Sequence, residues 1–363
     1  MYGLKQAPLL WNTHIHKTLS QLGFNRHDGE YGIYFKNYEN RKALVALYVD
    51  DLLIASPTEE IMKDIKYGLC KSYSMKDLGP VSKFLGMNVH QDGNNKVTIS
   101  MKDYIVKAAQ SCNIDLNRNV CCPLSASTNY FDEESPKIKN ITEYQSVVGQ
   151  LLFVSNVGRP DVAHSVQLLS RFLKDPREVH MKGAYRVMQY LYNTKNMGLV
   201  YSKQENRILE GYSDASHGNK NDLKFATSGF IVKLAGGVVT WSSKKITSTV
   251  CLSSTDAEYI SASNTSRELI WINNMLQHIG VKLDLINLWI DSKPAIQVTK
   301  NPVLHSKMKH VGLHYHFVRH QVEKGIINVG YVKTNEQIAD IMTKILSREI
   351  FVTICDKFMS YIK

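Results

Sequence analysis

Short apolar runs broken by polar turns dominate the first third of the chain. Residues 43–49 form an uninterrupted apolar run, and residues 52–55 form a second one that can return beside it. Runs of this length with turn residues between them are typical of buried strands. Only Asp50 and Asp51 separate the two runs. The pattern therefore predicts a hairpin that carries two acids at its tip.

Helical spacing replaces the strand pattern in the middle of the chain. Residues 126–140 are rich in Ser, Thr, Asn, Asp and Glu, so we expect a connector there. Beyond it, apolar residues recur every three or four positions over 162–173 and again over 184–191. This spacing predicts two helices with buried faces, the second of which ends near Gly198.

A third pattern starts at residue 208, where the predicted order is strand, strand, strand, helix, strand, helix, helix, strand and helix. Ser254 is the predicted N-cap of a long helix that reaches about Ile279, because a serine hydroxyl accepts hydrogen bonds from free amides of the first turn. In the last predicted helix, 338–345, the apolar residues share one face and Asp340 lies on the other. We expect a mixed α/β region.

Composition places the chain among globular proteins. Its 363 residues are 44% hydrophobic and 21% charged, which favours two or three folded domains over disorder. The longest apolar run is far shorter than a membrane helix, and the first residues lack the pattern of a secretory signal. We therefore expect an intracellular protein, cytoplasmic or nuclear, without a membrane partner. The 6 cysteines show no C-x-x-C spacing, so reduced thiols are expected.

An excess of basic residues narrows the choice of partner. Lys and Arg total 44 against 33 Asp and Glu, which gives a net charge of +11. Such a balance favours polyanionic partners, with nucleic acid first among them. A solvated basic surface that binds nothing anionic is the alternative, because charge alone does not separate the two.

Four acids stand where strands and helices of the third region begin or end. Asp214 ends the first strand, Glu258 lies in the first turns of the long helix, Asp291 ends the next strand, and Asp340 lies in the last helix. Carboxylates brought together repel one another unless a cation neutralises them, so a cluster favours Mg²⁺. Two such ions can activate water and stabilise the leaving oxygen in phosphodiester hydrolysis. Alternatively, each acid does only local work in a turn, a cap or a solvated face.

Six motifs follow one another in this region. In chain order they are Gly211-Tyr212-Ser213-Asp214-Ala215, Val239-Thr240-Trp241-Ser242-Ser243-Lys244-Lys245, Ser253-Ser254-Thr255-Asp256-Ala257-Glu258-Tyr259, Ile290-Asp291-Ser292, Lys309-His310 and Ile338-Ala339-Asp340-Ile341-Met342-Thr343-Lys344. Together they resemble the ribonuclease H (RNase H) domain of copia-type long-terminal-repeat retrotransposon Pol polyproteins. The resemblance implies an RNase H fold that cuts the RNA strand of RNA:DNA hybrids. It matches Asp214, Glu258, Asp291 and Asp340 to the family's metal-binding acids. Ser292 departs from the family, which usually has Asn there.

Motifs in the first half of the chain resemble other parts of the same polyprotein. Those similar to the later motifs of a copia-type reverse transcriptase are Tyr2-Gly3-Leu4-Lys5-Gln6-Ala7-Pro8, Leu47-Tyr48-Val49-Asp50-Asp51 and Met75-Lys76-Asp77-Leu78-Gly79 with Phe84-Leu85-Gly86. Residues 144–149 and 158–161 resemble the helical region that joins this enzyme to RNase H. In the family, a further metal-binding aspartate and the fingers precede the first of these motifs. We therefore expect a truncated fragment in which Asp50 and Asp51 are a residual polymerase motif without independent polymerase activity.

Basic residues near the acids are candidates for nucleic-acid binding. Lys244 and Lys245 follow a predicted strand, and Lys309 and His310 match a family motif. Such groups bind phosphates with little sequence preference. The alternative for each lysine is a solvated face. For His310 we favour packing and phosphate contact over a zinc site, because zinc needs more ligands than the paired histidines nearby supply.

The sequence as a whole predicts a fold of α/β and α+β class in four parts. These are a partial reverse-transcriptase palm and thumb (1–125), a helical connection (126–205), an RNase H-like mixed sheet with flanking helices (206–346) and a C-terminal tail (347–363). The predicted function is Mg²⁺-dependent hydrolysis of the RNA strand of RNA:DNA hybrids, with RNA and DNA as partners and the missing N-terminal Pol portion in the parent polyprotein. A non-catalytic, nucleic-acid-binding retrotransposon remnant and a metal-dependent transposase are the alternatives.

Overall fold

The structure of the chain is a computed structural model that describes residues 5–39, 41–92, 96–112, 114–204, 206–217, 226–247, 251, 253–300 and 312–362. The chain divides into two compact units. The first unit contains Met1–Val81 and Trp271–Lys282, and the second contains Ser82–Ile270 and Leu283–Lys363. Among the described residues, no helix has the length and apolar character needed to cross a membrane.

The first unit is built on a four-stranded antiparallel sheet in the order β1-β2-β3-β4. Apolar side chains of α1 and α2, among them Ile15 and Leu69, form a core with Tyr34 and Val45 of the strands. The predicted acidic hairpin is confirmed, because β3 and β4 pair across a short turn in which Val49 has a φ of 52°. The elements are α1 (Ala7–Gln21), β1 (Asn25–Arg26), β2 (Ile33–Tyr38), β3 (Arg41–Tyr48), β4 (Asp51–Ala55) and α2 (Glu59–Ser72).

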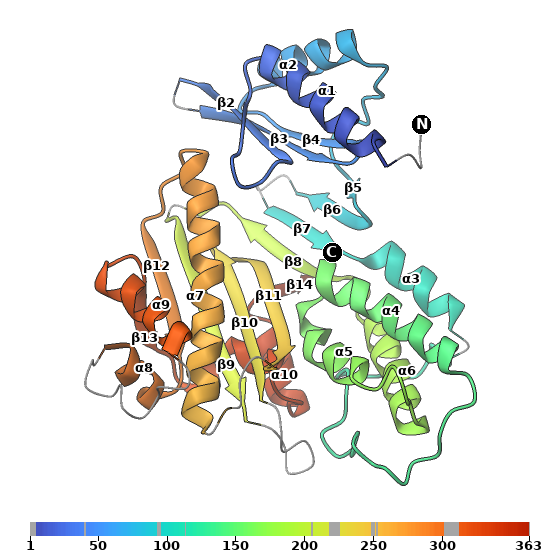
Figure 1. The fold of residues 1–363 in the computed structure, drawn as a ribbon. Helices are drawn as coiled ribbons and strands as arrows, with labels where there is room; N and C mark the ends of the chain where they lie inside the picture. The colour runs from blue at the N-terminus through green and yellow to red at the C-terminus, as the bar shows by residue number, and fades with distance from the viewer. Residues whose placement is uncertain are drawn as a thin grey trace. The chain divides into compact units, whose positions relative to one another are not determined.

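A mixed sheet in the order β11-β10-β9-β12-β13 forms one part of the second unit. β9, β10 and β11 are antiparallel, whereas β12 runs parallel to both β9 and β13. Figure 1 shows α7 along this sheet, and Gly211 permits the close approach, since a Cβ there would lie 2.7 Å from Thr265 of α7. The predicted mixed sheet with flanking helices is confirmed. Its elements are β9 (Ile208–Ser216), β10 (Thr227–Leu234), β11 (Gly237–Lys245), α7 (Ser254–His278), β12 (Leu285–Ile290), α8 (Lys293–Lys300), α9 (Gly312–Glu323) and β13 (Asn328–Tyr331).

Helices and a second sheet, in the order β14-β8-β7-β6-β5, make up the rest of the second unit. Residues 347–363 contribute α10 and β14, and β14 pairs with β8. The described elements are β5 (Lys83–Phe84), β6 (Met87–Gln91), β7 (Lys96–Ser100), α3 (Lys102–Ser111), α4 (Ile141–Val157), η1 (Pro160–Val162), α5 (Ala163–Ser170), α6 (Glu178–Asn193), β8 (Met197–Ser202), η4 (Thr334–Glu336), η5 (Ile338–Met342), α10 (Arg348–Cys355) and β14 (Met359–Tyr361).

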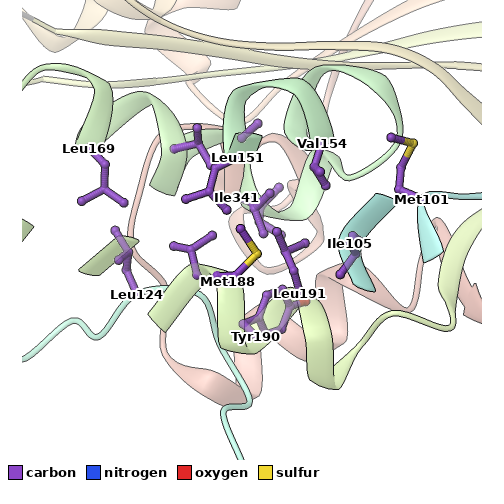
Figure 2. Packing of buried hydrophobic residues seen from close by; sticks show 14 of the residues in the cluster. Met101, Ile105, Leu124, Leu151, Val154, Leu169, Met188, Tyr190, Leu191 and Ile341 are labelled. Carbon is purple, nitrogen blue, oxygen red and sulfur yellow. The ribbon is translucent and has the colours of Figure 1, made fainter. Parts of the chain in front are cut away.

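One apolar core joins these helices to the mixed sheet. Figure 2 shows Ile341 of η5 among side chains that include Leu151 of α4 and Met188 of α6. Ile231 of β10 and Val238 of β11 belong to the same cluster. The apolar stripes predicted over 162–173 and 184–191 supply much of this core, which confirms the helical spacing.

Two predicted helix ends are wrong. α6 ends at Asn193 rather than near Gly198, because the chain is drawn into β8, where Gly198 pairs with Ser100 and sits against the Ile99 backbone. At the start of α7 the cap is Ser253 and not Ser254. The Ser253 hydroxyl accepts from the Asp256 amide at 3.1 Å, and the Asp256 carboxylate accepts from the Ser253 amide at 3.0 Å.

A buried ion pair connects the helices of the second unit. Arg159 and Asp161 are both fully buried, and the guanidinium donates to both carboxylate oxygens at 2.9 and 2.7 Å. Arg159 also donates to Thr194 at the end of α6, and the Tyr190 hydroxyl donates to Asp161 at 2.7 Å. The network satisfies both charges in a region that water does not reach.

Asp161→Asn should lower the free energy of unfolding by about 3–5 kcal/mol, because it leaves the Arg159 charge buried without its partner. Urea unfolding would measure the change. Lys182→Ala is the matched control, since it breaks an exposed pair with Glu178 on α6 and should leave the unfolding midpoint nearly unchanged. Equal effects of the two substitutions would contradict this account.

Candidate active site

The pairing of parallel strands brings the first and third predicted acids together. Asp214 lies near the end of the central strand β9 and is 1% exposed. Asp291 directly follows β12, whose last residue, Ile290, is in register with Ser213 of β9. The two acids therefore leave the same edge of the sheet side by side, as their positions at strand ends predict.

The fourth acid, Asp340, reaches this edge on a 3-10 turn instead of the predicted helix over 338–345. η5 ends at Met342, and Asp340 is buried rather than on a solvated face. Hydrogen bonds at both ends explain the short turn. Gln337 donates to the Ser213 carbonyl at 2.9 Å, and the Thr343 hydroxyl donates to the Asp214 carboxylate.

A glycine on the neighbouring strand makes room for this turn. Gly229 of β10 is paired with Asp214 in the sheet. A Cβ at Gly229 would lie 2.5 Å from the Cβ of Met342 and 2.6 Å from a side-chain carbon of Thr343. Only glycine therefore lets η5 pass over β10 closely enough for Thr343 to bind Asp214.

Glu258 enters the same region from the first turns of α7. Ser261, one turn later on α7, fixes the helix to the sheet by donating to the Asp214 carbonyl at 2.8 Å. Oε2 of the Glu258 carboxylate is buried without a hydrogen-bond partner among the described residues. An acidic oxygen in that condition is available as a ligand.

Lys344 is the cation nearest to the acids in the described part of the chain. Its ammonium lies 2.9 Å from Asp340 and 3.4 Å from Asp214. Sequence reasoning quoted Thr343 and Lys344 within a motif but assigned neither a role. The signal that could have found Lys344 is its spacing of four residues from Asp340, which suits an ion pair on a helical turn.

The protonation of the cluster follows from its burial and its crowding. Burial, together with the charges of Asp214 and Asp291, raises the pKa of Glu258 to about 9. Burial and Asp214 likewise raise the pKa of Asp340 to about 6, and they raise that of Asp291. Burial opposes the charge of Lys344, yet Asp214 and Asp340 raise its pKa above the usual range. The cluster thus binds protons more tightly than free carboxylates do.

The donor set fits a divalent metal ion. One carboxylate oxygen from each of Asp214, Asp291 and Asp340 lies within 4.8 Å of the other two. Oxygen ligands of this kind are those that Mg²⁺ prefers. Glu258 is not one of these three residues. It lies near them, since the charges of Asp214 and Asp291 raise its pKa.

The other predicted site residues lie elsewhere or outside the described residues. Asp50 and Asp51 are exposed at the β3–β4 turn, and the group of three potential metal ligands in the described chain does not include them. Lys244 and Lys245 stand at the end of β11, in register with Ser228 and Thr227 of β10. Lys309 and His310 lie outside the described residues.

The comparisons with known proteins identify the family. Residues 1–126 match the model described as reverse transcriptase (RNA-dependent DNA polymerase). A putative transposon Ty5-1 protein of Saccharomyces cerevisiae is 51% identical over 269 residues, which cover 74% of this chain and 87% of that protein. The chain belongs to the copia-type retrotransposon Pol family. A retrovirus-related Pol polyprotein from transposon TNT 1-94 of Nicotiana tabacum is 33% identical over 359 residues, or 97% of this chain.

The chain spans about a quarter of the length of the plant polyproteins it matches. It covers 27% of the Nicotiana tabacum polyprotein and 24% of a retrovirus-related Pol polyprotein from transposon RE1 of Arabidopsis thaliana. Among solved structures, an N-terminal RNase H domain from Mycobacterium tuberculosis, fused to maltose-binding protein, covers 42% of this chain at 16% identity and a TM-score of 0.27. The family assignment rests on the sequence relatives.

Gly229→Ala should destabilise the chain by about 1–3 kcal/mol, because the added methyl group overlaps Met342 and must push η5 away from β10. Urea unfolding would measure the loss. Gly149→Ala is the matched control: it lies inside α4 with open space around its added methyl, so it should be neutral or stabilise by up to ~1 kcal/mol. A neutral Gly229→Ala would mean that η5 does not pass over β10 as described.

Stability should fall as the pH rises from 5 to 9 when metal is chelated. An acid whose pKa is raised by folding binds more protons in the folded state than in the unfolded state. The stability that these protons contribute is lost as the pH rises from the pKa of the unfolded chain to that of the folded protein. Glu258, with its pKa near 9, dominates this window. Glu258→Gln should flatten the decline, measured as the urea midpoint against pH in chelator. Glu133→Gln, at an exposed loop position, should retain the wild-type slope.

Proposed function

We propose that this retrotransposon Pol fragment hydrolyses the RNA strand of RNA:DNA hybrids in a Mg²⁺-dependent reaction. The observation that carries the proposal is the gathering of Asp214, Asp291 and Asp340 at one edge of an RNase H-like sheet, with Glu258 beside them. These four residues come from four separate elements of the fold. Local roles in turns and caps do not require such a meeting.

Asp214, Asp291 and Asp340 would hold the metal, and Glu258 would complete the set by giving up the proton that its raised pKa retains. Bound Mg²⁺ supplies activation of water and stabilisation of charge on the phosphate and the leaving oxygen. Thr343 holds one oxygen of Asp214 in place through its hydroxyl. Lys344 offsets the repulsion between Asp214 and Asp340 when Mg²⁺ is not bound.

The charge of the chain supports a nucleic-acid substrate. The net charge is +11, and Lys244 and Lys245 stand at the end of β11, in the same sheet as Asp214. We assign them to phosphate contacts, which give affinity that falls as salt rises. The 2′-hydroxyl is the group by which such a site distinguishes the RNA strand from the DNA strand.

We further infer that the fragment has no independent polymerase activity. Nucleotide addition needs a cage of carboxylates around the metals that bind the incoming triphosphate. Asp50 and Asp51 provide an exposed pair at a turn, and the trio of potential ligands found among the described residues lies elsewhere in the chain.

Incubation with a labelled RNA:DNA hybrid and Mg²⁺ tests the nuclease activity. Wild type should release RNA fragments, chelator should stop the release, and Asp214→Asn should slow it by roughly 100-fold or more, because it removes one of the three carboxylates that would hold Mg²⁺. Asp64→Asn, at an exposed position of α2, is the charge-matched control and should cleave like wild type.

Two outcomes would decide against this function. If wild type binds the hybrid tightly and leaves it uncut, the chain is a non-catalytic, nucleic-acid-binding remnant. If Asp214→Asn cleaves as fast as wild type, the nuclease activity does not come from the acidic cluster.

A further inference from the structure

We propose that Lys344 competes with the metal ion for the acids of the site. Its ammonium binds Asp214 and Asp340 while no metal is bound, and it must leave them when Mg²⁺ binds. The proposal rests on the proposed function, because it concerns the same acidic cluster. It goes further by giving the chain an internal control over the Mg²⁺ concentration at which the cluster is filled.

The contacts of the ammonium carry the proposal. Its nitrogen lies 2.9 Å from Oδ1 of Asp340, and it lies 3.4 Å from each carboxylate oxygen of Asp214. Asp214 and Asp340 are two of the three acids whose oxygens lie within 4.8 Å of one another. The ammonium therefore uses carboxylates that a metal ion in this cluster requires.

Two cations that share these carboxylates repel each other. Mg²⁺ demands a near-octahedral set of oxygen ligands, so it needs the oxygens of the acids and not only their charge. An ion held by Asp214 and Asp340 would meet the charge of Lys344 across the same oxygens, and both acids are too buried for water to screen the repulsion well. Binding of Mg²⁺ is therefore coupled to release of the ammonium.

The position of Lys344 lets its side chain leave while the acids stay. Its side chain is 37% exposed, whereas those of Asp214 and Asp340 are 1% and 9% exposed. The backbone amide of Lys344 donates to the Asp340 carbonyl at 3.1 Å, which holds the main chain in place. Lysine carries its charge on a flexible four-carbon stem. The ammonium can thus turn to solvent without moving η5.

Thr343, the residue before Lys344, provides a contrast. Its hydroxyl also donates to Asp214, but the residue is buried and carries no charge. A neutral donor adds no repulsion against a metal ion, and a carboxylate oxygen has lone pairs enough for a metal and a hydroxyl. Thr343 can therefore stay in place when Mg²⁺ binds, so the exchange involves the charged neighbour and not the hydroxyl.

Thermodynamic linkage turns this competition into two measurable effects. If the ammonium weakens Mg²⁺ binding by some factor, Mg²⁺ weakens the binding of the ammonium to the acids by the same factor. Lys344 therefore stabilises the metal-free chain, and it raises the Mg²⁺ concentration needed to fill the site. A residue that only supported the metal ligands would strengthen Mg²⁺ binding instead.

The first test removes the charge in the full chain. Mg²⁺ binding is measured by calorimetry without substrate, and Lys344→Met should bind Mg²⁺ about 10-fold more tightly than wild type, a size typical of coupling between two sites. In chelator its urea midpoint should lie below that of wild type, and saturating Mg²⁺ should narrow the difference. Lys182→Met is the charge-matched control. This exposed lysine pairs with Glu178 on α6, so its loss should leave Mg²⁺ affinity unchanged.

The second test uses wild type and needs no variant. N-hydroxysuccinimidyl acetate acetylates free lysine amines, and the modified peptides are quantified by mass spectrometry at constant ionic strength. Acetylation of Lys344 should become faster when Mg²⁺ is added, because the metal releases its ammonium from the acids. Lys182 is the internal control, and its acetylation should not change. This measurement decides the proposal if Lys344→Met fails to fold in chelator.

The inference is wrong if Lys344→Met binds Mg²⁺ with the affinity of wild type or more weakly. It is equally wrong if Mg²⁺ slows the acetylation of Lys344 or leaves it unchanged, or if wild type binds no Mg²⁺. If Mg²⁺ binds and releases Lys344 while the RNA:DNA hybrid stays uncut, the proposed function fails and the competition stands.

Discussion

Repulsion among buried carboxylates is the constraint around which the second unit is organised. Asp214 and Asp340 are buried, and they share their surroundings with Asp291 and Glu258, so water screens little of their mutual charge. A fold can hold such a group only if each acid is anchored by its own element and some positive charge is near. Here the parallel register of β9 and β12 places Asp214 beside Asp291, and the close approach of η5 to Gly229 places Asp340. Lys344 supplies the positive charge.

The continuous core explains how a site can depend on residues far from it in sequence. Ile341 and Met342 pack with side chains of α4, α5 and α6 as well as with the sheet. The turn that carries Asp340 therefore has the helical connection on one side and β10 on the other. Removing the helices or the sheet would change the surroundings of η5. The residues on which the site depends therefore extend beyond the segment that a change of composition marks along the chain.

Sequence reasoning predicted what depends on local spacing. The β3–β4 hairpin, the long helix ending near residue 278 and the strand-end positions of Asp214 and Asp291 follow from periodicity and turn residues, and the structure has them. It failed where a distant segment decides. α6 stops early because residues 197–202 pair with β7, and the 3-10 form of η5 depends on Gln337 and Thr343 binding β9.

The two acidic pairs of the chain show that environment, and not motif, determines what carboxylates can do. Asp50 and Asp51 are adjacent in sequence, but they are exposed at a turn where water screens their repulsion. Asp214 and Asp340 are 126 residues apart, yet both are held around one ammonium in a buried site. Only the second arrangement leaves an electrostatic demand that a divalent cation would satisfy. The position of η5 is therefore important. A small displacement of Asp340 away from Lys344 would leave a buried carboxylate charge without its partner.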